Sequence, residues 1–360
     1  MRLHCIGIPH TITRKDYLTC AFTQKVWKFC KMMTERGHHV IHYGHELSDV
    51  PCTEHVSVLP DKYFDISYGK RDKTKQFYSW KENDLAYLIF KESAAAEIHK
   101  RIQKDDIVLP FFGDPVKPVC DSLETALVCE PGIGYGAGHF APYKVFESYA
   151  ILHAYYGLAG VSRCHNDWRN IVIPNYFDPD DFEYNDKKDD FVLFLGRVYQ
   201  GKGIDTAIEA TRRAGRKLIV AGQMPEVIDF PDHVKYVGVA GTEMRKDLLS
   251  KAAALIAPSE FVEPFGGVQV EALLSGTPTI TSDIGAFVEN NHNGVTGYRC
   301  QVYDEFYDAL MNIDKIDPKI CRSFGEQFLL ENVAPRYERF FERIIINHGK
   351  KRQEHASRAS

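Results

Sequence analysis

The strongest constraint on the fold is a regular alternation of apolar strand-like segments with amphipathic helical segments. Residues 3–8 and 39–43 have the composition of buried strands. Between them, Val26, Phe29 and Met33 recur at helical spacing. The order strand, helix, strand predicts a parallel sheet, because parallel strands need a long crossover connection that is usually a helix.

The same order returns in the second half of the chain. Strand-like segments at residues 191–195 and 217–221 lie on either side of a helical segment at 206–214. Further strands are expected at residues 107–112, 125–129, 235–237, 254–257 and 279–281, and further helices at 85–103 and 244–252. Residues 61–82 are predicted to form a polar, aromatic loop, and residues 143–149 to open a helix.

A stretch rich in Pro, Asn and Asp at residues 174–186 is typical of a linker. We therefore expect an α/β protein with two doubly wound, Rossmann-like domains facing a central cleft. The predicted domains are residues 1–173, residues 174–335 and a C-terminal helix with a polar tail at 336–360. Ligands in such folds bind beyond the carboxyl ends of the strands, so we expect the functional site there.

Composition excludes several classes of protein. The 360 residues are 44% hydrophobic and 26% charged, with a net charge of -5, which argues against nucleic acid as the main partner. No run of about 18 apolar residues predicts a membrane-spanning helix, and the N-terminus lacks the pattern of a signal peptide. A basic patch assembled by the fold would still allow peripheral contact with a membrane.

The cysteines indicate a reducing compartment. There are nine, an odd number, and none forms a Cys-x-x-Cys pair. We expect free buried thiols and a cytoplasmic location. Four histidines, His38, His39, His42 and His45, are close together, but strand alternation separates them and no neighbouring ligand completes a set. No metal site and no cofactor are predicted.

Residues 259–280 carry the most specific chemical signal. Glu263 and Glu271 flank the glycine pair Gly266 and Gly267, and an apolar helical run follows. A helix N-terminus that opens on glycines offers free N–H groups and a partial positive charge to phosphate. Carboxylates on either side would accept hydrogen bonds from sugar hydroxyls, so the segment predicts a site for a nucleotide diphosphate sugar.

Two basic residues follow the first strand of the second half. Gly196 allows a tight exit from the strand, and Arg197 and Lys202 come next. Arginine forks onto phosphate oxygens and lysine adds a point charge. Together they would neutralise a diphosphate leaving group without a metal. Taken alone, the loop reads equally well as two solvated basic residues.

Together these motifs resemble the retaining nucleotide-sugar glycosyltransferases of family four (glycosyl transferases group one), which have the GT-B fold. The resemblance covers residues 171–300, where Ile173 to Asp178 is similar to the interdomain segment and residues 290–298 to the Asn-Gly-x-Thr-Gly-Tyr ending. It implies that the C-terminal helix crosses back to the first domain. The residue roles implied by the resemblance are diphosphate binding by Arg197 and Lys202, backbone N–H contacts from Gly266, Gly267 and Val268, ribose binding by Glu271, and contact with the transferred sugar by Glu263.

The first half matches only in pattern. The family's glycine-rich loop after the first strand is represented by one glycine, so His10 or Thr11 is the candidate for contact on this side. Residues 130–140 carry four glycines after a strand. The resemblance makes His139 the candidate facing the reacting sugar, with Glu130 second; a glycine-rich turn with a surface histidine is an equal reading.

The predicted function is transfer of a sugar from a nucleotide diphosphate sugar to a hydroxyl acceptor, which is a glycan, a lipid-linked sugar or a small molecule. A nucleotide-sugar epimerase on the same plan and a non-catalytic nucleotide-sugar binder are the alternatives. Sugar, base, acceptor and oligomeric state are not indicated by the sequence.

Overall fold

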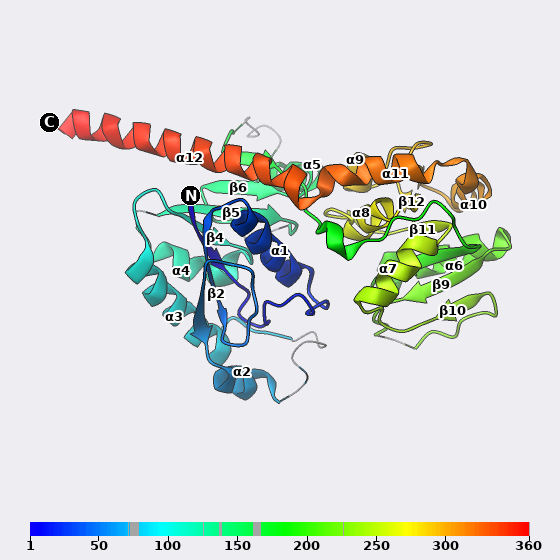
Figure 1. The fold of residues 1–360 in the computed structure, drawn as a ribbon, viewed down its shortest axis with the longest axis horizontal. Helices are drawn as coiled ribbons and strands as arrows, with labels where there is room; N and C mark the ends of the chain where they lie inside the picture. The colour runs from blue at the N-terminus through cyan, green and yellow to red at the C-terminus, as the bar shows by residue number, and fades with distance from the viewer. Residues whose placement is uncertain are drawn as a thin grey trace. The chain divides into compact units, whose positions relative to one another are not determined.

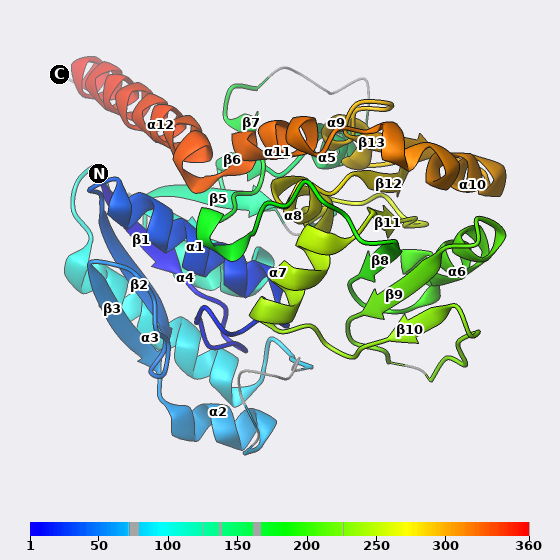
Figure 2. The same cartoon turned by 45° about the vertical axis from the view of Figure 1, so that its right-hand side comes forward.

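The computed structural model describes residues 1–70, 72, 79–124, 126–136, 139–160, 167–225 and 227–359. The chain forms two compact units. Unit 1 comprises residues 1–147, 154–176 and 333–360, and unit 2 comprises residues 148–153 and 177–332. Together, Figures 1 and 2 label the strands and helices of both.

Within the described residues, unit 1 contains a sheet of seven parallel strands in the order β3-β2-β1-β4-β5-β6-β7. The strands are β1 (Arg2–Ile6), β2 (His39–His45), β3 (Glu54–Leu59), β4 (Ile107–Pro110), β5 (Leu127–Ile133), β6 (Tyr143–Phe146) and β7 (Asn170–Val172). The helices connecting them are α1 (Ala21–Glu35), α2 (Asp61–Tyr68), α3 (Leu85–Arg101), α4 (Lys117–Asp121) and α5 (Tyr149–Ala159), with a 3₁₀ turn at Asp114–Val116. The first residues of α5, up to His153, are assigned to unit 2.

Unit 2 repeats the plan with six described strands in the order β10-β9-β8-β11-β12-β13. The strands are β8 (Phe191–Leu195), β9 (Lys217–Ala221), β10 (Val234–Tyr236), β11 (Ala254–Ala257), β12 (Thr279–Ser282) and β13 (Gly297–Cys300). The helices are α6 (Ile204–Arg213), α7 (Thr242–Lys251), α8 (Gly267–Leu274), α9 (Phe287–Asn290), α10 (Tyr303–Asn312) and α11 (Pro318–Gly325), and 3₁₀ turns lie at Pro179–Asp181, Gln200–Lys202, Ile313–Lys315 and Glu326–Phe328. Figure 2 shows β8, β9 and β10 side by side.

The alternation of side chains along β8 explains why helices cover both faces of this sheet. Val192 and Phe194 belong to the apolar cluster that also contains residues of α6 and α10. Leu193 and Leu195 belong to a second cluster that contains residues of α7 and α8. A strand buried on both faces is a continuous apolar run, as β8 is. The predicted fold class, two doubly wound parallel sheets, is confirmed.

The long C-terminal helix α12 (Leu330–Ala359), red in Figure 1, has an apolar face as predicted. From Val333 onward it belongs to unit 1. The Phe29 ring of α1 packs edge-on against Tyr337, with ring centroids 5.2 Å apart, and Arg36 pairs with Glu338 at 2.7 Å. Within the described residues, none of the helices is long and apolar enough to cross a membrane.

Two predicted segments differ from the structure. Residues 61–68 form helix α2 rather than a loop, because Phe64 and Tyr68 turn into the core of unit 1. Residues 143–146 form strand β6 rather than a helix start, because they pair with β5 and β7, and helix α5 begins only at Tyr149. The aromatic residues Phe77 and Tyr78 lie outside the described residues.

The eight cysteines that the structure describes carry free thiols, and all but Cys52 are buried. Cys164 lies outside the described residues.

Candidate functional site

The structure brings Lys202 and Glu263 together at the carboxyl edge of the unit 2 sheet. Lys202 follows β8 and Glu263 follows β11, its neighbour, so both lie where the strand order reverses. The Lys202 ammonium is 2.8 Å from Oε2 of Glu263, and the Ser259 hydroxyl donates to the same oxygen at 3.0 Å. Crevices at such reversal points are where open α/β sheets bind ligands. Sequence reasoning gave Ser259 no role, and its partner is visible only in three dimensions.

Two glycines allow the backbone to pack closely around this pair. Gly203 has φ +74°, and a Cβ there would lie 2.0 Å from the carbonyl oxygen of Pro258. Gly266 has φ +76°, and a Cβ would lie 2.4 Å from the Phe287 ring. Both positions favour glycine through backbone conformation and available space. Helix α8 therefore begins at Gly267, only a few residues after Glu263.

The first turn of α8 carries the predicted phosphate-binding groups, the backbone N–H groups of Gly266, Gly267 and Val268. Gly267 is the first helical residue and Gly266 precedes it. N–H groups in a first helical turn have no partner within their helix and lie at the positive end of its dipole. This arrangement suits an anion.

Arg197 lies on the same loop as Lys202 but in a different setting. Its side chain is exposed, and its guanidinium is 5.8 Å from the ring centre of Tyr199. The backbone around it is fixed, since Gly196 N–H donates to Ala221 and Val198 N–H donates to Gln223, at 2.9 and 2.8 Å. Arg197 is therefore free to extend toward a ligand, whereas Lys202 is already paired.

Glu271 lies inside α8, as predicted, and pairs with Arg245 of α7. The Arg245 Nε is 2.7 Å from Oε2 of Glu271, and Nη2 contacts the same oxygen. Arg245 was not among the predicted site residues. Nothing in its local sequence marks it, because the contact depends on how α7 and α8 pack.

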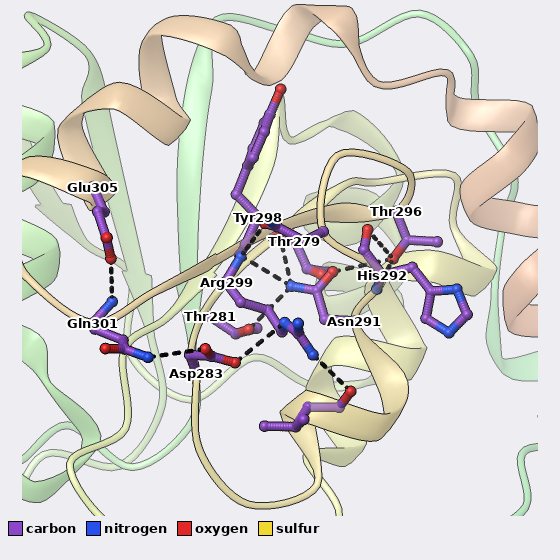
Figure 3. A network of polar contacts seen from close by, with 12 residues as sticks. Thr279, Thr281, Asp283, Asn291, His292, Thr296, Tyr298, Arg299, Gln301 and Glu305 are labelled. Atoms are coloured by element: carbon purple, nitrogen blue, oxygen red, sulfur yellow. Dashed lines mark hydrogen bonds and ion pairs between the residues drawn. The ribbon is translucent and has the colours of Figure 1, made fainter.

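A polar network around Asn291 links β12 to β13 (Figure 3). Buried Asn291 donates to the carbonyls of Thr279 and Tyr298, at 3.3 and 3.1 Å, and to the Thr281 hydroxyl at 3.0 Å. The Thr296 hydroxyl donates to Asn291 Oδ1 at 3.1 Å. These bonds link β12 to β13 and fix the turn that carries the Asn-Gly-x-Thr-Gly-Tyr motif.

The segment between β12 and Asn291 forms hydrogen bonds to the loop that carries Glu263. Ala286 N–H donates to the Glu263 carbonyl at 2.9 Å, and Asn290 donates to the Phe265 carbonyl at 3.0 Å. In the same segment, the Asp283 carboxylate pairs with the Arg299 guanidinium at 3.2 Å. The motif that resembles a family ending thus has a structural role here, because it fixes the loop that carries Glu263.

In unit 1, Glu130 lies within β5 and its side chain is fully buried. Its Oε2 accepts hydrogen bonds from the N–H groups of Phe140 and Ala141, at 3.1 and 3.0 Å, and its Oε1 accepts one from the Tyr135 hydroxyl at 3.2 Å. Burial raises the pKa of Glu130 to about 7, despite these bonds and the nearby Lys144. Glu130 thus closes the glycine-rich loop on itself.

His139 lies on that loop and is partly buried. Its Nε2 is 3.0 Å from the Tyr135 carbonyl oxygen, and its ring stacks on Tyr135 with centroids 5.3 Å apart. Burial lowers the pKa of His139, which favours the neutral imidazole. Its preceding neighbours Ala137 and Gly138 lie outside the described residues.

His10 and Thr11 lie after β1, and both are buried. His10 Nδ1 is 2.7 Å from the Tyr87 hydroxyl, its ring stacks on Trp80, and burial lowers its pKa to about 3. The Thr23 hydroxyl donates to Thr11 Oγ1 at 2.8 Å. For either side chain to contact a phosphate, it would have to leave these partners.

Beneath the glycine-rich loop lies an ion pair that sequence reasoning missed. Lys25 of α1 and Glu147 are both buried and in direct contact, and Lys25 donates to the Gly132 carbonyl at 2.7 Å. Asn175 donates to Glu147 at 2.9 Å. Gly134 leaves room for the carboxylate, since a Cβ there would lie 2.6 Å from it. The sequence signal that could have predicted this pair is Lys25 itself, a lysine on the apolar face of α1.

The four clustered histidines have separate surroundings. His38 pairs with Glu338, His42 faces His55 across β2 and β3, and His45 pairs with Asp61. His39 opens β2.

Comparison with known proteins shows which family the second half of the chain resembles. Residues 178–327 match the family model described as glycosyl transferases group 1. Glycogen synthase of Mycobacterium tuberculosis (strain H37Rv) is 34% identical over 127 residues, which cover 31% of this chain and 30% of that protein. The chain thus spans less than a third of the length of this relative. Phosphatidyl-myo-inositol mannosyltransferase of Mycolicibacterium smegmatis is 26% identical over 279 residues, 68% of this chain and 69% of that protein.

Among solved structures, Anabaena Alr3699/HepE in complex with UDP and glucose superimposes with a TM-score of 0.67 at 14% identity. The alignment covers 95% of this chain and 99% of that one. At this identity the likeness shows the fold alone, which is shared over nearly the whole chain. Residues 178–327 thus belong to the glycosyl transferases group 1 family, and the chain as a whole has the GT-B fold.

Proposed function

We propose that this chain transfers a sugar from a nucleotide diphosphate sugar to a hydroxyl group of an acceptor, with retention at the anomeric carbon and without a metal. The observation that carries the proposal is the convergence of Lys202 and Glu263 at 2.8 Å beside the first turn of α8. A cation, a carboxylate and a helix N-terminus are the groups that a diphosphate and a sugar require. The names of the relatives, a glycogen synthase and a mannosyltransferase, and the UDP and glucose in the HepE structure, support the same class of donor.

The donor diphosphate would bind the first turn of α8 through the N–H groups of Gly266, Gly267 and Val268. Arg197, which is exposed, would extend onto the phosphate oxygens, and Lys202 would turn from Glu263 to the same charge. Basic groups and a helix N-terminus aimed at the leaving group stabilise the charge that develops as the glycosidic bond breaks. The chain would need no metal for this step.

Binding of the donor would also release the carboxylate of Glu263 for the hydroxyls of the transferred sugar. Ser259 would keep its hydrogen bond to Oε2 and so hold the carboxylate in place when Lys202 moves. Glu271 would accept hydrogen bonds from the ribose. The candidate contacts from unit 1 remain His139 and Glu130, with His10 or Thr11 on the acceptor side.

The test compares Lys202→Ala and Glu263→Ala with wild type in a transfer assay that measures release of nucleoside diphosphate. Donors are first chosen by thermal shift with UDP, GDP and ADP, since a ligand of the native state raises its stability. Each variant should lower kcat at least tenfold, which corresponds to about 1.4 kcal/mol in the barrier. Lys251→Ala is the matched control, because this α7 lysine pairs only with surface Asp247 among the described residues.

Near-wild-type transfer by either site variant would refute the assignment. Formation of a new nucleotide sugar from the donor alone would favour an epimerase, and donor binding without transfer to any acceptor would favour a binding protein. The anomeric configuration of the product, read by NMR, tests retention, and activity in EDTA tests independence from metal.

A further inference from the structure

The pairing of Arg245 with Glu271 is one-sided. Both Nε and Nη2 of the guanidinium contact a single carboxylate oxygen, Oε2. Among the described residues, none donates a hydrogen bond to the other oxygen, Oε1. A guanidinium that paired side by side with a carboxylate would occupy both oxygens. The observed geometry therefore holds the carboxylate while leaving one oxygen able to accept.

The packing of two helices fixes this geometry. Leu248 and Leu249 of α7 share an apolar cluster with Ala272 and Val268 of α8. These contacts set the register in which Arg245, one turn before Leu249, reaches Glu271. The backbone at Arg245 is itself held, since its N–H donates to the Gly241 carbonyl at 2.8 Å.

Burial distinguishes the two partners. The Glu271 side chain is 15% exposed and that of Arg245 is 34% exposed. A largely buried carboxylate needs a hydrogen-bonding partner. Arg245 supplies one from the more exposed side and restricts the rotamers of Glu271, so that the open oxygen has a defined direction before any ligand arrives.

We propose that Arg245 is a positioning residue of the donor site: it presents Oε1 of Glu271 to the ribose hydroxyls and thereby makes the site prefer ribonucleotides to 2′-deoxyribonucleotides. The inference rests on the proposed function, in which Glu271 binds the ribose. Arg245 itself does not contact the nucleotide. Loss of a hydroxyl from the ribose leaves the held carboxylate with an unused acceptor, which is the basis of the preference.

The experiment measures dissociation constants by calorimetry for UDP, GDP and ADP and for their 2′-deoxy counterparts. For whichever base binds, wild type should favour the ribonucleotide about tenfold or more, as expected for a hydrogen bond to a charged group. In Arg245→Met the preference should fall below about threefold, while Arg245→Lys, which keeps one donor, should lie between.

Lys246→Met is the matched control, because Lys246 is the next residue on α7 and pairs with Glu243 rather than Glu271. It removes the same charge and should leave the preference unchanged. If the ion pair is purely structural, Arg245→Met should weaken the binding of the ribonucleotide and of its 2′-deoxy counterpart equally, and the ratio of their dissociation constants should not change. Circular dichroism confirms that each variant is folded.

A wild-type ratio near one, or an unchanged ratio in Arg245→Met, overturns the inference. In the second case, Glu271→Gln shows whether the ribose role survives, since that variant should still lose the preference. Absence of binding by any of the nucleoside diphosphates refutes the proposed function itself, so the two failures are distinguishable.

Discussion

Replacing Lys25 by methionine should strongly destabilise unit 1. The Lys25 and Glu147 side chains are only 7% and 6% exposed, so the substitution leaves a buried carboxylate without its counter-ion. It also removes the hydrogen bond to the Gly132 carbonyl. Breaking a buried ion pair by removing one partner costs about 3–5 kcal/mol, whereas methionine keeps most of the aliphatic volume.

Tryptophan fluorescence reports this effect on unit 1 alone. The three tryptophans, Trp27, Trp80 and Trp168, all belong to unit 1. With a urea slope of about 2 kcal/mol/M, the expected loss moves the unfolding midpoint by about 2 M. The midpoint of the fluorescence transition is therefore the measurement.

A second variant separates charge from packing. In Lys25→Met with Glu147→Gln, no buried charge remains and the amide can still bond to Asn175, so more than half of the loss should be recovered. Lys117→Met, which breaks an exposed ion pair with Asp121 in unit 1, is the control and should not shift the midpoint. A single variant within about 1 kcal/mol of wild type, or a double variant as unstable as the single one, would refute the reasoning.

Two further predictions test the supporting groups. Because burial raises the pKa of Glu130 from 4.5 to about 7, the folded state keeps a proton that the unfolded chain has lost in this window. The free energy of unfolding should therefore fall by on the order of 3 kcal/mol as pH rises from 4.5 to 7. Glu130→Gln should remove this fall, measured by urea titrations followed by fluorescence. Equal pH profiles for wild type and variant would contradict the prediction. Asn291→Ala breaks the four hydrogen bonds of a buried side chain and should cost at least about 2 kcal/mol, seen as a lower calorimetric Tm. Val295→Ala, at an exposed position of the following turn, should leave the Tm unchanged; equal Tm values for both variants would show that the network is dispensable.

Several elements could be predicted from the sequence because their signals are local. The apolar run at β8 and the helical spacing of Val26, Phe29 and Met33 on α1 record burial directly in the order of residues. The same holds for the glycine that opens α8, since the left-handed backbone at Gly266 favours glycine. Strand β6 was missed because its short apolar pattern fits a helix as well as a strand, and only its pairing with β5 and β7 decides between them. Helix α2 was missed because its polar and aromatic residues fit a loop as well as a helix, and only packing on the core of unit 1 decides.

The candidate site divides in the same way. The sequence by itself determined which groups follow β8 and β11, and the parallel order of the strands then required Lys202 and Glu263 to share one edge of the sheet. Only the tertiary structure decided which of them touch, that Ser259 and Arg245 hold the two glutamates, and that Lys25 and Glu147 form a buried pair. The physical reason is that backbone propensity and hydrophobic periodicity act between near neighbours in the chain, whereas contacts between residues far apart in sequence depend on the register in which whole helices and strands pack.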